Sequence, residues 1–583
     1  PRRRSMVRNR SIKWLLPATL LLSLGSQAEL KVAIINAEQA IVQSEEGKAK
    51  NIALRFKNIP ILYLPRLTFP TNDDRKSGFL IPSFGSSSKR GLEIEIPYYW
   101  NLAPNADLKT TVNWMKKRGA EIKSQLRFRP PKQHASIDLN HLPSDDLFND
   151  DRTYSKINYQ FNPSLNTQIE VTGEYASDTN YFEDLSQSTN ESSRTHLTRD
   201  VAFKSFGKNW VMNLGMTNYQ ILDDQPKCLA IGICDQNDPY RLKPYMNFNA
   251  SWQSKKSKIN FDIDSEVVFF DHLQSESGKR IRNRTTLSKL FNFSGIEVTP
   301  AVALDYAKFK PDAHEKDTDR TIPIYSLDIK ANLIKISNDG DVRQSIQPRV
   351  MAVYIPFEDQ SEFPFIDTLM PDFNYFQLFN ENRFIGNDRI GDTSKISYGI
   401  VAKRTRIQSG KDFFEFTLGQ TLHLKDEKIA MPGDSIRRSG SLTNLASLDV
   451  AMTESLNLKL DHYWDSDVDE MKRSQIGIEY KDSSSKRLDL AYRFRKQNIK
   501  QIHGSFSWPI KDRWSFIGHY KYSIKDRKTI DQFFGLNYET CCWSISAVSR
   551  KHLLYRNGET DTSFSVQFMF KGLGEFGLSL IHI

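Results

Sequence analysis

The chain has 583 residues, a mass of 67.3 kDa, 39% hydrophobic residues, 26% charged residues and a mean hydropathy of -0.53. This composition excludes a bundle of transmembrane helices, and the 11% aromatic content excludes a disordered chain. The net charge of +10 comes from 80 basic and 70 acidic residues without a long basic block. We therefore expect no nucleic-acid partner, whereas an anionic lipid partner is compatible with this charge.

Residues 1–28 have the layout of a secretory signal peptide. Arg8, Arg10 and Lys13 follow Met6, an apolar run extends from Leu15 to Leu24, and Ser26-Gln27-Ala28 offers a small-residue cleavage site. No later stretch reaches about 18 consecutive apolar residues, so the sequence predicts no transmembrane helix. The chain is expected to be exported to the periplasm, the outer membrane or the exterior.

Residues 29–52 form a short segment of a different kind. The stretch 29–51 is typical of a short strand that enters an amphipathic helix. It resembles the start of the Skp/OmpH family of periplasmic chaperones, but it stops before that family's long helical arms. A chaperone function would rest on this stretch alone, and the following five hundred or so residues argue against it.

From about residue 91 onward, apolar and polar residues alternate over many segments of about ten residues. In 165–175 the apolar positions include Leu165, Ile169 and Val171; the segments 259–269 and 488–494 follow the same pattern. Strands of this length match a tilted crossing of a bilayer. Aromatic residues also recur near segment ends, as Trp508 and Trp514 do.

Connection lengths separate a membrane barrel from soluble alternatives. Short polar turns such as 482–485 alternate with long loops such as 221–242 and 357–372, as in outer-membrane barrels. The roughly 480 residues from 91 to 571 correspond to about 24 strands at about 20 residues each. A string of soluble β-sandwich domains would alternate as well, but no domain linkers and no fixed repeat period occur. We predict an all-β fold: a segment 53–90 that leads into a large transmembrane antiparallel β-barrel over 91–583.

Three groups of motifs carry a resemblance to a known family. The first contains Arg55-Phe56-Lys57-Asn58-Ile59-Pro60, Arg75-Lys76-Ser77-Gly78, Pro97-Tyr98-Tyr99-Trp100-Asn101 and Arg118-Gly119. The second contains Gln377-Leu378-Phe379-Asn380-Glu381-Asn382-Arg383-Phe384 and Asp388-Arg389-Ile390. The third contains Gly535-Leu536-Asn537-Tyr538-Glu539 and Cys541-Cys542-Trp543. Over residues 53–577 the chain resembles the LptD family of LPS-assembly proteins.

The resemblance implies a barrel of about 26 strands in the cell outer membrane, plugged by a lipoprotein, LptE. It implies that lipopolysaccharide arrives from a periplasmic Lpt bridge and leaves sideways, between the first and last strands, and that the barrel-assembly machinery inserts the protein. Pro82 and Pro97 lie where that family has its gate prolines, and prolines weaken a sheet because they cannot donate to its ladder. Ordinary turn or strand-start prolines are the alternative. Charges such as Glu170, Asp262 and Arg493 could steer phosphorylated sugars or simply hydrate the lumen.

The four cysteines permit three disulfide pairings in an exported protein. Adjacent Cys541 and Cys542 cannot easily bond to each other, so each should need a distant partner. Cys228 and Cys234 are six residues apart in a long loop and could pair together; structural or metal-binding thiols are the alternative. The resemblance places the partners of the adjacent pair in a periplasmic jelly-roll domain, which we find missing here. We expect a truncated or fused chain, for which docking to the bridge is doubtful.

Other functions have less support. No nucleophile, zinc or phosphate motif occurs around the 11 histidines, so we expect neither an enzyme nor a cofactor or metal. An outer-membrane hydrolase is therefore a weak alternative. A passive porin or substrate-specific diffusion channel shares the alternation, but would not require Pro82, Pro97 or the adjacent cysteines.

Overall fold

A computed structural model describes most of the chain, and every structural statement below refers to the described part. The described residues are 46–56, 59–70, 75–222, 227–228, 234–235, 239–273, 275–312, 316–371, 373–432, 436–466, 470–482, 485–496, 498–511, 513–540, 543–554 and 558–570. The predicted signal peptide, residues 1–28, lies outside this part. The chain divides into two units, Pro1–Gly78 and Phe79–Ile583.

The first unit contains a two-stranded antiparallel sheet. Strand β1 (Glu46–Phe56) pairs with β2 (Ile59–Pro70), with Glu46 opposite Pro70. For the stretch 29–51 the sequence predicts a short strand that enters an amphipathic helix. The helix is wrong for 46–51, because these residues pair with β2 instead of forming helical bonds four residues apart. The remainder of that predicted segment, 29–45, lies outside the described residues.

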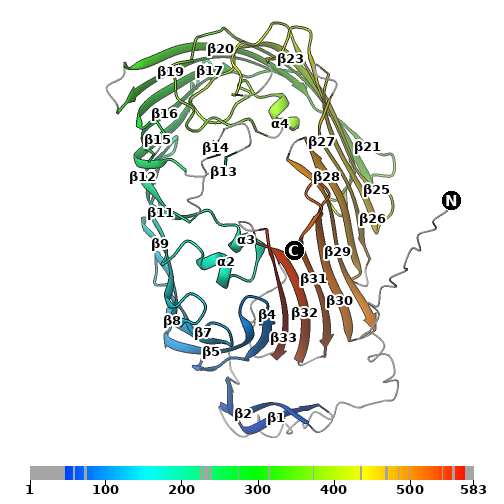
Figure 1. Cartoon of the computed structure of the whole chain (residues 1–583). Coiled ribbons are helices and arrows are strands. Elements are labelled where there is room, and N and C mark those ends of the chain that lie inside the picture. The colour runs from blue at the N-terminus through cyan, green and yellow to red at the C-terminus, as the bar shows by residue number, and fades with distance from the viewer. Residues whose placement is uncertain are drawn as a thin grey trace, which may run out of the picture. The chain divides into compact units, whose positions relative to one another are not determined.

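The second unit is a closed antiparallel β-barrel of 26 strands, in which β4 lies next to β33 (Figure 1). The predicted fold class is confirmed. The first half of the wall contains β3 (Gly78–Phe79), β4 (Ser83–Ser87), β5 (Gly91–Ala103), β6 (Ala106–Met115), β7 (Gly119–Phe128), β8 (Gln133–Asp145), β9 (Asp150–Ser164), β10 (Thr167–Ala176), β11 (His196–Phe206), β12 (Trp210–Ile221), β15 (Arg241–Gln253), β16 (Ile259–Asp271), β17 (Gly278–Lys289), β18 (Phe291–Phe293) and β19 (Ile296–Pro311).

The second half of the wall contains β20 (Thr318–Ala331), β21 (Leu333–Ile336), β22 (Val342–Ile355), β23 (Thr393–Arg406), β24 (Asp412–His423), β25 (Leu442–Ala451), β26 (Leu456–Asp465), β27 (Glu470–Lys481), β28 (Arg487–Arg495), β29 (Ile499–Lys511), β30 (Trp514–Ser523), β31 (Lys528–Glu539), β32 (Trp543–Leu553) and β33 (Thr560–Phe570). Strands β18 and β21 continue β17 and β20 after one-residue interruptions, and β3 pairs with β5 as β4 does, so the 29 segments make 26 strands. A separate small sheet pairs β13 (Lys227–Cys228) with β14 (Cys234–Asp235). The barrel thus begins before residue 91.

Alternation along the strands separates the two faces of the wall. In β28, Leu488, Leu490 and Tyr492 alternate with Asp489, Ala491 and Arg493. Leu490 is opposite Ile478 of β27, another exposed apolar residue. The segment 259–269 lies within β16 as predicted. The segment 165–175 begins with a turn instead, because Leu165 and Asn166 connect β9 to β10.

Connection lengths differ between the two ends of the barrel. Because consecutive strands are antiparallel neighbours, every second connection lies at the same end. The loops 177–195, 222–240, 356–392 and 424–441 all lie at one end, the long-loop end. Tight turns such as Pro104-Asn105 and Ser294-Gly295 lie at the other, the short-turn end.

The described helices are short and lie in two of the long loops. Helices α2 (Tyr181–Leu185) and α3 (Thr189–Ser192) belong to residues 177–195, which we call the small lumenal loop. Helix α4 (Tyr375–Leu378) belongs to residues 356–392, the large lumenal loop. All three helices lie inside the ring of strands (Figure 1). No described helix has the length and apolar character needed to cross a membrane.

Candidate functional site

The barrel closes through a short ladder between its last and first strands. In this closing seam, β33 pairs with β4 from Ser563 opposite Ser87 to Gln567 opposite Ser83. Strand β4 has only 5 residues, whereas β33 has 11 and pairs with β32 along its whole length. Residues 568–570, the last three of β33, therefore extend past the seam ladder at the short-turn end.

Both predicted gate prolines lie where the seam ladder ends. Pro82 immediately precedes β4, and Pro97 lies within β5 opposite Thr111 of β6. The carbonyl oxygen of Pro97 accepts a hydrogen bond from the backbone N–H of Leu80 (2.9 Å). In a strand, the nitrogen of a residue faces the same edge as its carbonyl, so Pro97 cannot return that bond. Pairing along this edge of β5 is therefore weakened at the short-turn end of the seam.

The predicted motif around Pro97 splits between the two faces of β5. Tyr98 contacts Phe79 edge-on, with ring centroids 4.9 Å apart, and Trp100 at 4.5 Å. Tyr99 is buried on the opposite face, where its hydroxyl donates to Asp107 (3.3 Å), and Asn101 lies at the end of β5 opposite Asp107. The other predicted motif residues, Arg75, Lys76, Ser77 and Gly78, belong to the first unit, and Gly78 begins β3.

The second motif group forms the attachment of the large lumenal loop to the wall. Asn374 caps α4, because its side chain accepts hydrogen bonds from the N–H groups of Phe376 and Gln377. Leu378 and Phe379 of this motif are buried against apolar wall residues, which include Ile322, Ile324, Met351, Val353 and Ile355. Gly399 and Gly419 are opposite each other in β23 and β24 and leave the space that α4 occupies. A side chain at Gly419 would meet Leu378 at 2.5 Å.

Arg383 and Phe384, also predicted as motif residues, lie in the same loop. The guanidinium of Arg383 pairs with Glu427 and lies over the Phe384 ring, 4.7 Å from its centroid. Glu381 accepts a hydrogen bond from Ser326 of β20 (2.7 Å) and pairs with Arg284 of β17. The motif thus binds the loop to β17, to β20 and to the loop 424–441.

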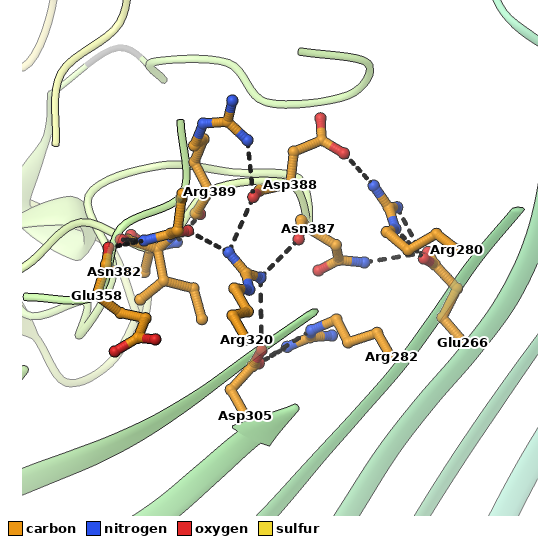
Figure 2. Close-up of polar contacts among 12 residues, drawn as sticks. Glu266, Arg280, Arg282, Asp305, Arg320, Glu358, Asn382, Asn387, Asp388 and Arg389 are labelled. Atoms are coloured by element: carbon orange, nitrogen blue, oxygen red, sulfur yellow. Dashed lines mark hydrogen bonds and ion pairs between the residues drawn. The ribbon is translucent and has the colours of Figure 1, made fainter. Parts of the chain in front are cut away.

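A buried ionic network continues this attachment (Figure 2). Arg280 of β17 is 1% exposed, and its Nε donates to Glu266 of β16 (2.7 Å). It pairs with two loop carboxylates, Asp367 (2.5 Å) and Asp388. Arg320 of β20 donates to the backbone carbonyl oxygens of Asn387 and Asp388, each at 2.8 Å. Two wall arginines therefore hold the loop through side chain and backbone.

Asp388 also organises the loop itself. Its Oδ2 accepts hydrogen bonds from the backbone N–H groups of Ile366 (2.8 Å), Asp367 (2.6 Å) and Thr368 (3.1 Å). Burial and the neighbouring Asp367 carboxylate raise the pKa of Asp388 to about 6. Burial also opposes ionisation of Asp367, but Arg280 outweighs it and holds the pKa of Asp367 below its ordinary value. The positive charge of Arg280 favours the ionised form of both carboxylates.

The backbone at Gly386 lies so close to Asp367 that only glycine should fit there, which can be tested by substitution. Gly386 has φ +85°, and an added Cβ would lie 2.2 Å from the carbonyl oxygen of Asp367. We expect Gly386→Ala to destabilise the folded loop by about 1–3 kcal/mol, measured by urea unfolding. Gly410→Ala is the matched control, because Gly410 has φ +65° with nothing within 4 Å. Equal losses of unfolding free energy in the two variants would show that the contact with Asp367 is unimportant.

The sequence did not single out the arginines of this network or their wall carboxylates. Arg280 and Arg320 occupy ordinary polar positions in alternating strands, and nothing local distinguishes them from solvated lumen charges. Of the predicted lumen charges, Glu170 accepts a hydrogen bond from Lys204 (2.5 Å). No three His, Cys, Asp or Glu side chains form a possible metal site in the part of the chain that the structure describes.

The predicted disulfides stay a prediction. Cys541 and Cys542 lie outside the described residues. The backbone of Cys228 is opposite that of Cys234 in the small β13–β14 sheet, and their side chains are not described.

Comparison with known proteins identifies the family. The profile described as "LPS transport system D" matches residues 150–514, more than half of the chain, and a second profile, "LptD protein", matches residues 49–133. The chain belongs to the LptD family. Its resemblance to that family, inferred from the three motif groups, is confirmed. The Skp/OmpH resemblance of residues 29–51 stays without support from these comparisons.

Curated LptD relatives match along most of the chain. The LPS-assembly protein LptD of Nitrosococcus oceani is 28% identical over 553 residues, which cover 93% of this chain and 74% of the relative. That of Thiobacillus denitrificans is 29% identical, covering 94% of this chain and 74% of the relative. Among solved structures, the alcaligin outer membrane receptor FauA of Bordetella pertussis covers 89% of this chain and 80% of its own, with 7% identity and a TM-score of 0.28, which is too low to carry an argument.

Proposed function

We propose that this LptD family member inserts lipopolysaccharide into the outer leaflet of the outer membrane, and that the lipid leaves the lumen sideways through the closing seam. The proposal is carried by the seam itself, which is paired over only 5 residues of β4 and is flanked by Pro82 and Pro97. The curated relatives are named LPS-assembly proteins, which supports lipopolysaccharide as the cargo. The proposed role requires no covalent chemistry.

The short ladder lowers the free-energy cost of opening. Each backbone hydrogen bond contributes about 0.5–1.5 kcal/mol in water, and an unpaired backbone group in hydrocarbon costs several kcal/mol. Parting β4 from β33 breaks far fewer such bonds than parting β19 from β20, which pair from Ile296 to Phe309. The ladder between β4 and β5 is equally short, but a turn connects those two strands, whereas none connects β33 to β4. A barrel that opens sideways should therefore open at this seam.

We propose further partners for the same role. A lipoprotein plug of the LptE kind would occupy the lumen, the periplasmic Lpt bridge would deliver the lipid, and the barrel-assembly machinery would insert the barrel. The polar lumen wall, with charges such as Glu170 and Lys204, supports a hydrated interior that a polar partner or a sugar headgroup can enter.

A disulfide across the seam tests the proposed exit. An added Cβ at Gly85 would lie 3.8 Å from the Cβ of Ser565, within the range that a disulfide requires. In cells whose surface lipopolysaccharide depends on this protein, we expect Gly85→Cys with Ser565→Cys to stop delivery of new lipopolysaccharide to the surface. Addition of a reductant should restore delivery, which is measured by labelling from outside the cell.

A second disulfide serves as the matched control. Ser397 and Thr421 are opposite each other in β23 and β24, and their hydroxyl oxygens are 2.8 Å apart. Ser397→Cys with Thr421→Cys should lock that strand pair without affecting delivery. Normal delivery in cells whose seam disulfide has formed completely would falsify the lateral exit and favour a route through the open lumen.

A further inference from the structure

The two ends of the closing seam are held very differently. At the long-loop end, Asp561 of β33 is 1% exposed, and its Oδ1 accepts hydrogen bonds from the Ser88 hydroxyl (2.5 Å) and the Lys89 backbone N–H (3.3 Å). The backbone N–H of Ser88 also donates to the carbonyl oxygen of Thr562 (2.9 Å). The turn between β4 and β5 therefore clasps β33 at this end, whereas the ladder stops at Pro82 at the other.

Arg90, in the same turn, connects this clasp to the interior. Its side chain is 2% exposed, and Nη1 lies 3.7 Å from Oδ2 of Asp561 while donating to the carbonyl oxygen of Ser186 (2.8 Å). Its Nε donates to Glu93 of β5 (3.0 Å). One guanidinium thus contacts β33, β5 and the small lumenal loop, to which Ser186 belongs.

The small lumenal loop is itself held by Arg118, in the turn between β6 and β7, and by Arg152, near the start of β9. Asp184 pairs with Arg118 (3.2 Å) and with Arg152 (3.0 Å), and Arg152 also pairs with Asp178 (2.7 Å). Arg118 additionally donates to the carbonyl oxygen of Lys89 (3.3 Å), so that it supports the clasping turn directly.

Apolar contacts complete the docking of this loop. Tyr181 and Phe182 of α2 pack in a buried cluster with Ala176, Leu197 and Leu222. The Tyr181 hydroxyl donates to Glu121 of β7 (3.1 Å). The small lumenal loop is therefore a packed part of the interior beside the seam, and its position determines where Arg90 lies.

We propose that the small lumenal loop latches the long-loop end of the closing seam through Arg90. While the loop is docked, the carbonyl of Ser186 holds the guanidinium beside Asp561 and stabilises the clasp. When the loop leaves its site, Arg90 loses the Ser186 carbonyl and Arg118 loses Asp184 while it keeps its pair with Asp145 (2.7 Å), so the clasp on β33 weakens chiefly through Arg90. The use of this latch to control lipid exit rests on the proposed function, whereas the coupling between loop and seam does not.

Hydrogen exchange of the purified protein in lipid nanodiscs, without lipopolysaccharide, tests the coupling. The variant Asp178→Asn with Asp184→Asn alters two loop residues whose ion pairs, within the described part of the chain, are with Arg118 and Arg152 and not with β4 or β33. We expect the amides of residues 84–88 and 561–565 to exchange about ten- to hundred-fold faster, which is the size expected for loss of a charge-assisted hydrogen bond. Glu381→Gln, in the large lumenal loop, is the matched control and should leave seam exchange unchanged.

Two results would overturn the latch. The first is faster exchange in residues 181–193 of the double variant with unchanged exchange at the seam, since the loop would then move without consequence. The second is unchanged seam exchange in Arg90→Gln, which removes the connecting charge directly. Because no lipid is present, a failure of the latch is distinguishable from a failure of the proposed lateral exit, which the seam disulfide tests in cells.

Discussion

Replacing Arg280 by methionine should release the large lumenal loop from the barrel wall and destabilise the protein by about 3–5 kcal/mol, the cost of breaking a buried ion pair from one side. Arg280 is 1% exposed and is the shared ion-pair partner of Glu266, Asp367 and Asp388. Methionine retains much of the packing against Phe270, whose ring centroid lies 4.8 Å from the guanidinium, but leaves three carboxylates without that partner.

The measurement combines urea unfolding in lipid vesicles with limited proteolysis of residues 356–392. We expect cleavage in this loop to increase while the barrel stays closed. Lys330→Met is the matched control, because the pair of Lys330 with Glu297 (2.9 Å) is largely exposed and should contribute at most about 1 kcal/mol. If residues 356–392 of Arg280→Met stay resistant to proteolysis, the apolar contacts of Leu378 and Phe379 suffice to hold the large lumenal loop.

Arginine substitutions at two consecutive positions of β28 should have opposite outcomes. Leu490 is 45% exposed on the apolar face of the wall, near the middle of the strand, so Leu490→Arg should destabilise the inserted barrel by about 2–4 kcal/mol. Ala491 shares the lumen face with Arg493 and Arg495, so Ala491→Arg should be nearly neutral. The difference arises because one guanidinium would enter hydrocarbon and the other would enter a hydrated interior.

Reversible unfolding of both variants in lipid vesicles measures this difference, with the native chain as reference. A barrel whose exposed apolar face contacts lipid predicts a clear loss for Leu490→Arg alone. Equal stability of the two variants in vesicles would contradict the assignment of that face to the membrane. The comparison is internal to one strand, so differences in expression or insertion affect both variants alike.

The sequence by itself determined the barrel, its approximate strand number and its two unequal ends. Alternation is a local property with a period of two residues, and turn residues and loop lengths are read directly along the chain. The motif groups determined the family for the same reason, because they are contiguous runs of residues. The sequence pattern predicts a strand at Leu165, where the structure has a turn, because the alternation continues across this short connection.

Only the tertiary structure decided which charges act together. The Ser88 hydroxyl meets Asp561 across 473 positions, and Arg280 meets Asp388 across 108. Closure of the ring and entry of the long loops bring these residues together, and every inward-facing arginine has the same local pattern whether it is solvated or buried. Long-range pairing and burial therefore distinguish Arg90 and Arg280 from other lumen charges, because the free energy of an ion pair depends on its partner and its exposure to water.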